Sequence, residues 1–161
     1  MDTGLVGEYE VVALKLEPED TELQFVTFYV ADIFLGIDIR QIREINRQLE
    51  PIRVPHSPDH ILGVINLRGE VTTIADLRRI LGLLPGELSR EARNLIVNSQ
   101  GESIGLQVDR VCDTLTIHSD QIRPVPGNVD RVAGRFLTGV HTTDSELLVI
   151  LNVEAALGDQ V

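Results

Sequence analysis

The second half of the chain repeats the pattern of its first half, and this repeat constrains the fold more than any other feature of the sequence. Residues 35–42 align with residues 104–111 at an offset of 69 residues, with a glycine and four apolar positions in common. Residues 70–77 align with residues 146–153 at an offset of 76 residues, and the agreement extends to a later glycine in each copy. The sequence therefore predicts an internal duplication whose second copy carries a seven-residue insertion.

The two copies are small and rich in β-branched residues. They span approximately residues 23–85 and 93–158, and residues 86–93 form the best candidate linker. Ile, Leu and Val must fill the core, because the chain has no Trp, 2 Tyr and 4 Phe. Short strands separated by Gly and Pro turns are typical of small barrels. We therefore predict a mainly β fold of two tandem barrels with short connecting helices, a pattern that is compatible with exchange of strands between them. The seam between two such barrels is a natural place for a groove.

Shorter patterns predict the individual elements. Strand signals and turn residues predict strands at residues 25–30, 33–39, 63–67 and 70–75, with turns at Ala31-Asp32 and Arg68-Gly69. From Ile39 to Leu49 the apolar residues recur at spacings of 3, 3 and 4, which predicts a short helix over residues 39–49 with mostly buried isoleucines. Asp76 is a good N-cap for a second short helix, whose apolar positions are Leu77, Ile80, Leu81 and Leu84.

Negative charge is concentrated at the N-terminus. The chain holds 25 Asp and Glu against 14 Lys and Arg, which gives a net charge of −11. Residues 1–22 contain seven of the acids and one lysine, so this segment alone carries −6. We expect it to be a flexible acidic tail, with room for a short strand at residues 11–16, ahead of a folded part at residues 23–158. Because a negative protein repels phosphate backbones, nucleic acid is not expected as the main partner.

Apolar runs and cysteine usage indicate the cellular compartment. The longest unbroken apolar run is residues 147–151, whereas a membrane span needs about 20 residues. The first residues have neither a basic region nor an apolar stretch, so no secretory signal is visible. The single cysteine, Cys112, cannot form an internal disulfide. These features predict a cytoplasmic protein without direct membrane insertion.

Residues that could carry catalysis are scarce. His56 and His60 have the spacing of a helical zinc site, but Pro58 lies between them and no third ligand is obvious. Cys112 and His118 could in principle pair as nucleophile and base, but Cys112 lies in a strand-like run and reads better as a half-buried packing thiol. The nucleophile-elbow, dinucleotide and Walker-type motifs do not occur. We expect no catalytic residue, no metal and no cofactor.

Arg68 is the residue with the most open interpretation. It lies at the tight turn between two apolar strands, in the run Val64-Ile65-Asn66-Leu67-Arg68-Gly69. It is either a solvated turn residue or a planar donor held beside apolar surface, as interface hot spots often are.

At these residues the sequence resembles the CheW-like family of chemotaxis coupling proteins, from about residue 23 to residue 158. The motifs of the first half are Gly36-Ile37-Asp38-Ile39, the Asn66-Leu67-Arg68-Gly69 turn with the strand before it, and Asp76-Leu77-Arg78. Those of the second half are Gly105-Leu106-Gln107-Val108-Asp109 and Asp120-Gln121-Ile122-Arg123-Pro124-Val125-Pro126. The resemblance implies two tandem SH3-like five-stranded barrels and a non-catalytic adaptor. Such an adaptor joins the cytoplasmic hairpin tip of chemoreceptors to the regulatory domain of a CheA-type histidine kinase.

The resemblance also nominates contact residues and a location. It places the receptor contact at Ile42, Glu44, Ile45, Gly63, Asn66 and Arg68, and it suggests Val111 and Asp113, as exposed turn residues, for the kinase. It implies recruitment from the cytoplasm to membrane-associated receptor arrays, where self-association into mixed rings is compatible with the family pattern. A twitching, gliding or other chemosensory-type pathway is the first alternative. A small barrel that binds a ligand or nucleic acid is a weaker one, because six aromatic residues and the net charge argue against it.

Overall fold

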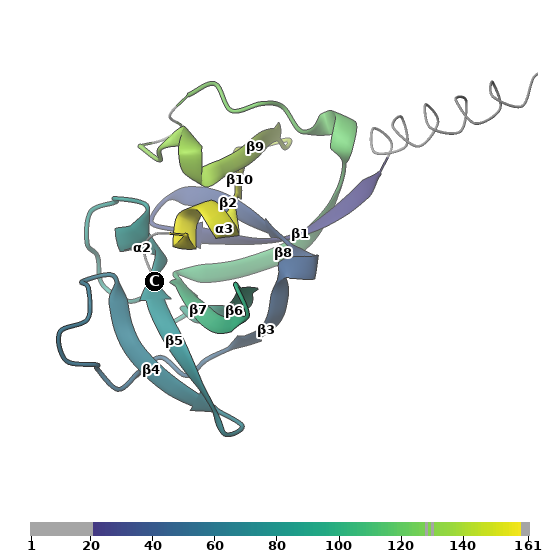
Figure 1. Ribbon diagram of the computed structural model, residues 1–161. Helices are drawn as coiled ribbons and strands as arrows, with labels where there is room; N and C mark the ends of the chain where they lie inside the picture. The colour runs from purple at the N-terminus through teal and green to yellow at the C-terminus, as the bar shows by residue number, and fades with distance from the viewer. Residues whose placement is uncertain (1–20, 128, 130, 159–161) are drawn as a thin grey trace, which may run out of the picture.

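The strands of the protein form two five-stranded sheets. The structure is a computed structural model, which describes residues 21–127, 129 and 131–158. The first sheet has the strand order β8 (Arg110–His118), β1 (Glu22–Val30), β2 (Ile33–Asp38), β10 (Leu147–Leu151) and β9 (Leu137–Thr142). The second has the order β3 (Ile42–Asn46), β6 (Arg93–Ser99), β7 (Glu102–Val108), β5 (Glu70–Asp76) and β4 (Ile61–Leu67). In Figure 1 the β9–β10 and β4–β5 hairpins lie at opposite ends of the molecule.

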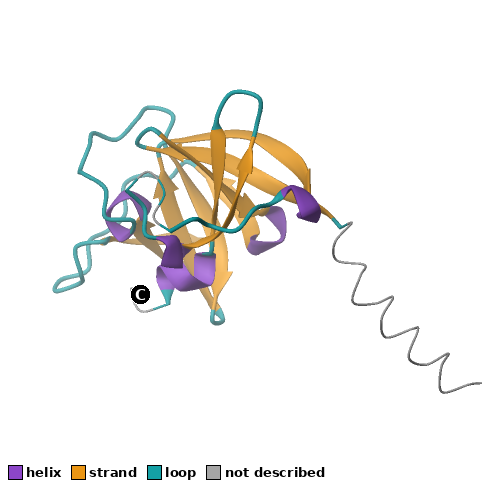
Figure 2. Ribbon diagram, turned by 90° about the horizontal axis from the view of Figure 1, so that it is seen from above, coloured by secondary structure: helices purple, strands orange, loops and turns teal. Residues whose placement is uncertain are grey.

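The helices are short and lie outside the sheets (Figure 2). They are α2 (Leu77–Ile80), α3 (Val153–Leu157) and the 3-10 turns η2 (Ile39–Gln41), η3 (Ser119–Gln121) and η4 (Gly134–Phe136). The mainly β fold predicted from the sequence is therefore confirmed. The acidic tail, including the strand suggested at residues 11–16, lies outside the described residues except for Thr21 and Glu22.

The registers of the two sheets reproduce the sequence repeat. β10 runs parallel to β2 and pairs Val149 with Leu35, whereas β5 runs parallel to β7 and pairs Thr73 with Ile104. Leu35 and Ile104 differ by the offset of 69, and Thr73 and Val149 differ by the offset of 76. Corresponding strands thus occupy corresponding places, and each sheet combines strands from both sequence copies. The chain passes from the first sheet to the second at η2 and returns at Asp109.

One apolar core fills the space between the two sheets. Its fully buried residues come from both sheets and from α2, and include Phe28, Leu35, Ile37, Leu77, Leu95 and Leu106. Both helices begin at a polar cap. The Asp76 side chain accepts a hydrogen bond from the Arg78 backbone N–H at 3.0 Å, and the Asn152 side chain accepts one from Ala155 at 3.0 Å. The predicted cap at Asp76 is therefore confirmed. Asn152, its counterpart in the second copy, caps α3 in the same way.

Two local predictions are wrong. The helix predicted over residues 39–49 is a single 3-10 turn followed by β3, with Ile39 and Ile45 38% and 42% exposed. Isoleucine is β-branched and fits a strand well, and β3 satisfies its backbone by pairing with β6. The second error is Leu84, which is 76% exposed because α2 already ends at Ile80.

Candidate functional site

The turn between β4 and β5 has a well-defined geometry. Arg68 and Gly69 have φ values of 53° and 86°, as a two-residue type I′ hairpin turn requires. The Asn66 side-chain oxygen accepts a hydrogen bond from the Gly69 N–H at 2.7 Å and so braces the turn. The turn predicted at Arg68-Gly69 is confirmed, and it holds the Arg68 backbone in a conformation that few residues adopt.

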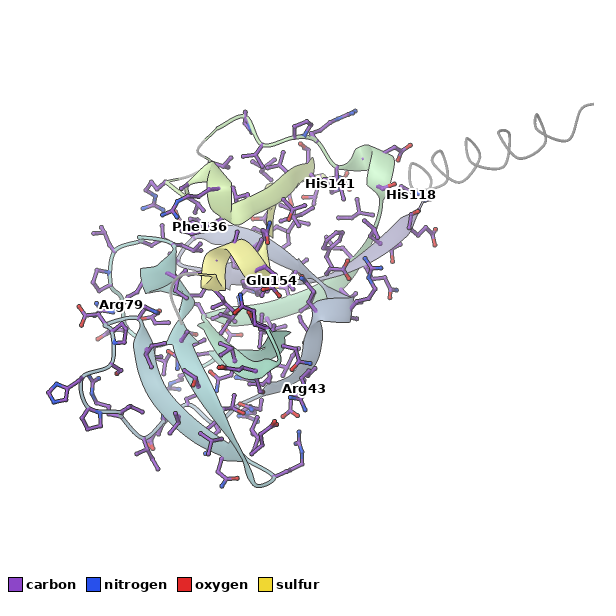
Figure 3. All side chains as sticks on the ribbon, viewed as in Figure 1. Arg43, Arg79, His118, Phe136, His141 and Glu154 are labelled. Carbon is purple, nitrogen blue, oxygen red and sulfur yellow. The ribbon has the colours of Figure 1, made fainter. Side chains whose placement is uncertain are left out.

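Two ion pairs connect this turn to the opposite edge of the same sheet. The Arg68 guanidinium donates to the Glu44 carboxylate on β3, and the Arg43 guanidinium lies 3.5 Å from the Glu70 carboxylate on β5. Because β3 and β4 are the two ends of the strand order, the Arg68–Glu44 pair brings the two sheet edges together, and the Arg43–Glu70 pair joins β3 to β5 beside the turn. Figure 3 shows Arg43 on β3 at the end of the molecule where the hairpin lies. The hydrogen bond from Arg68 holds the pKa of the Glu44 carboxyl below its ordinary value.

The hairpin tip also presents an apolar side chain to solvent. Val71 pairs with Asn66 across the hairpin and is 67% exposed. The side chain of Arg68 is 70% exposed despite its ion pair. We call Glu44, Asn66, Arg68 and Val71 the hairpin-tip site. An exposed arginine fork beside an exposed apolar side chain is the composition expected of a protein-binding surface.

The structure brings together only some of the residues nominated for receptor binding. Glu44, Asn66 and Arg68 meet at the hairpin tip. Ile42 is half-buried against the main core, and Ile45 is exposed further along β3. Gly63 lies within β4, with a φ of 144°, where the Ile52 carbonyl approaches it closely. Sequence reasoning missed Val71, although an exposed β-branched residue just after the turn could have been found from the alternation along β5.

Val111 and Asp113, the residues suggested for kinase contact, lie in the strand β8 and not in an exposed turn. The connection from β7 is only one residue long, so β8 has already begun at Arg110. Val111 is half-buried against the main core, and the Asp113 side chain is exposed. The two residues occupy the positions of Ile42 and Glu44 in the second copy, at the offset of 69. The two nominated surfaces are therefore corresponding places on the two sheets.

A groove of about 420 Å³ opens on the first sheet, where its apolar lining includes Leu23, Phe25, Ile122 and Ile150. Arg40 and Asp38 lie at its rim and form an ion pair with each other at 2.6 Å. The predicted seam between two barrels does not host this groove, since its lining comes from the first sheet, η2 and the segment after η3.

The histidines and the cysteine considered above as catalytic candidates lie in irregular or half-buried surroundings. His56 has a φ of 64° and lies with His60 in an irregular segment, not on one face of a helix. Within residues 21–127, 129 and 131–158, no cluster of three or more His, Cys, Asp and Glu is arranged to hold a metal ion. Cys112 is half-buried in β8, and this burial raises the pKa of its thiol. A thiol of this kind is a weak nucleophile at neutral pH.

The protection of Cys112 leads to a direct prediction. At pH 7.5 the native thiol should react with iodoacetamide at least about tenfold more slowly than the same thiol in the urea-unfolded chain, because both its thiolate fraction and its access are reduced. The measurement is the labelled fraction against time by intact-mass spectrometry. A native rate equal to or above the unfolded rate would indicate an activated thiolate and would contradict the protected thiol described above.

None of the helices in the described part of the chain is long and apolar enough to cross a membrane.

Known proteins resemble the chain over most of its length. A family model described as the CheW-like domain matches residues 24–161. A probable chemotaxis protein CheW of Rhizobium etli is 34% identical over 146 residues, which cover 89% of this chain and 92% of that protein. The protein FrzA of Myxococcus xanthus is 30% identical over 138 residues, which cover 84% of this chain and 86% of that protein.

A solved structure agrees with the architecture. The crystal structure of the scaffolding protein TtCheW from Thermoanaerobacter tengcongensis superposes with a TM-score of 0.76 at 29% sequence identity. The match covers 83% of this chain and 86% of that chain. The agreement therefore extends over both sheets.

Proposed function

The chain belongs to the CheW-like family, and from that premise we propose that it is a non-catalytic adaptor of chemotaxis signalling. In this role it couples methyl-accepting chemoreceptors to the regulatory domain of a CheA-type histidine kinase. The observation that carries the proposal is the match of the CheW-like model to residues 24–161, which spans both sheets. An adaptor needs two binding surfaces and no reacting group, and the ordinary surroundings of Cys112 and of the histidines support that assignment.

The hairpin-tip site is the proposed receptor surface. A receptor hairpin is a pair of helices, whose apolar side chains would contact Val71 and Ile45 while Arg68 binds a carboxylate or a carbonyl at the rim. Arg68 is suited to this because its turn fixes the backbone and its side chain is 70% exposed. Gly63 acts from beneath, by shaping the strand that leads into the turn.

The proposed kinase surface is the β8 edge of the first sheet, including Val111 and Asp113. β8 is an edge strand, so one side of its backbone is available to a partner sheet. Small signalling interfaces bury about 1,200 Å² or less and bind weakly. An array of receptors, kinases and adaptors raises the effective concentration of each contact and makes weak contacts sufficient.

The adaptor would work in the cytoplasm, at receptor arrays that are themselves anchored in the membrane. Self-association into rings with the kinase domain is part of the proposal, because two sheets of the same design offer corresponding edges. The second candidate function is the same adaptor role in a twitching, gliding or other chemosensory-type pathway. The similarity to FrzA, a relative that is not named as a chemotaxis protein, supports this second candidate.

Co-sedimentation tests the proposal. Receptor-containing membranes are incubated with the full chain and a CheA-type kinase, and the pellet and the kinase phosphorylation rate are measured. We expect the chain to pellet with the receptors, to carry the kinase with it, and to raise the phosphorylation rate over that of kinase and receptor alone. The bare vesicles without receptor are the control. A chain that stays in the supernatant with both partners present would refute the proposal.

A further inference from the structure

Asp109 joins the two sheets at the place where the chain crosses between them. It is the single residue between β7 of the second sheet and β8 of the first. Its carboxylate accepts a hydrogen bond from the Ala31 N–H at 2.6 Å, in the β1–β2 turn of the first sheet. The same oxygen accepts from Arg78 Nη2 at 2.5 Å, on α2, which follows the second sheet's β5. One carboxylate oxygen therefore ties a turn of one sheet to a helix of the other.

The Arg78 side chain is held in place by its own neighbours. Its Nη1 donates to the Leu84 carbonyl at 3.3 Å. A Cβ at position 86 would lie 2.5 Å from this Nη1, so Gly86 leaves the room that the guanidinium occupies. The side chains of Arg78 and Asp109 are only 18% and 21% exposed. Such a charge-assisted, mostly desolvated contact has a defined geometry, unlike an ion pair on the surface.

The duplicated fold does not require this contact. By the two offsets, the counterparts of Arg78 and Asp109 are Glu154 and Arg40, so the charges are exchanged. These counterparts bind other groups. Glu154, labelled in Figure 3, accepts from the Ser99 hydroxyl at 3.2 Å, and Arg40 pairs with Asp38 in its own segment. The Arg78–Asp109 pair is therefore particular to one copy, which separates it from the features needed by both.

The chain connects the pair directly to both surfaces of the proposed adaptor. The β5 strand that leaves the hairpin-tip site runs directly into α2, and Val111 follows Asp109 by two residues. We propose that Arg78 and Asp109 are positioning residues that fix the orientation of the hairpin-tip site relative to the β8 surface. The pair binds neither partner, and it lets receptor and kinase fit the adaptor at the same time. This inference rests on the proposed adaptor function.

The test compares Asp109→Asn, Arg78→Lys and their double variant with Asp38→Asn, which removes a carboxylate at the other crossing. Binary dissociation constants are measured for a receptor cytoplasmic fragment and for the kinase regulatory domain, followed by receptor-stimulated kinase phosphorylation. We expect the three pair variants to lose about fivefold in stimulation while both binary constants stay within about twofold. The double variant should lose no more stimulation than the single variant with the larger loss. The stimulation by Asp38→Asn should stay within about twofold of that by the parent chain.

A geometric readout keeps this inference separate from the proposed function. Spin labels are attached at cysteines replacing Val71 and Asp113 in a Cys112→Ser chain, and the distance between them is measured by pulsed electron resonance. We expect a wider distance distribution in Asp109→Asn than in the parent chain, at a temperature where melting curves show both to be folded. Where Asp109→Asn does not fold, Arg78→Lys, which keeps the charge, is measured in its place.

Each result has a distinct meaning. An unchanged distance distribution in the folded variants overturns the positioning role. A loss of stimulation that is matched by an equal loss of affinity for one partner also overturns it. In that case the pair would act through one binding surface and not by orienting two. A parent chain that fails to stimulate the kinase refutes the proposed function, and the inference about coupling falls with it.

Discussion

Replacing Arg68 by glutamate is expected to lower receptor-stimulated kinase phosphorylation about tenfold, as loss of a hot-spot arginine does, while the melting temperature changes by less than about 4 °C. The substitution removes the exposed guanidinium from the hairpin-tip site and places a second carboxylate beside Glu44. Stability should be little affected because Arg68 and Glu44 form a surface pair, and such pairs contribute little. The backbone strain is unchanged, because a φ of 53° is equally unfavourable for glutamate and for arginine.

Arg53→Glu is the matched control for this prediction. Arg53 is exposed in the segment before β4, and its replacement changes the net charge by the same amount. If overall charge repels the partners, both variants lose stimulation equally. If the hairpin-tip site binds the receptor, only Arg68→Glu loses it. Stimulation retained by Arg68→Glu would remove Arg68 from the proposed receptor surface.

The repeat was predictable from sequence because it rests on residues whose roles are local. Asp76 and Asn152 cap corresponding helices, and their positions in the chain alone reveal the offset of 76. The pairing of strands across the copies was not predictable in the same way. A parallel pair such as β2 with β10 joins segments more than a hundred residues apart. The residue pattern of either segment does not indicate which strand it pairs with.

The error at residues 39–49 has a specific physical cause. Isoleucines spaced by three residues fit one face of a helix, and the same residues also suit an edge strand in which some side chains are exposed. Tertiary pairing with β6 decided between them. The spacing of the isoleucines does not reveal this pairing, because β6 lies about 50 residues further along the chain.

The candidate site was predictable in part for a similar reason. The Arg68-Gly69 turn is visible in the sequence because turn geometry is local. The ion pair between Arg68 and Glu44 joins residues on different strands and follows only from closure of the sheet. The roles of Asp109 and Arg78 were also hidden, because their contact depends on the chain crossing between sheets.

Gly63 is a position where a single methyl group is expected to lower stability strongly. A Cβ there would overlap the carbonyl oxygen of Ile52, and the φ of 144° is itself unfavourable for any residue but glycine. The overlap cannot be relieved by a rotamer change, because the neighbouring group is backbone. Ile52 and Val64 exchange two backbone hydrogen bonds of 2.8 Å at this point, so movement of the segment would break them. We expect Gly63→Ala to lower the free energy of unfolding by about 3–5 kcal/mol.

Gly69→Ala separates the two causes of that loss. Gly69 also has a positive φ, of 86°, but no atom lies within 4 Å of the Cβ that alanine would add. It should therefore show the backbone strain alone, about 1 kcal/mol, whereas Gly63→Ala adds the collision. Urea unfolding followed by circular dichroism measures both. Equal losses in the two variants would mean that Ile52 moves aside freely, and the expected collision with the Ile52 carbonyl would then be wrong.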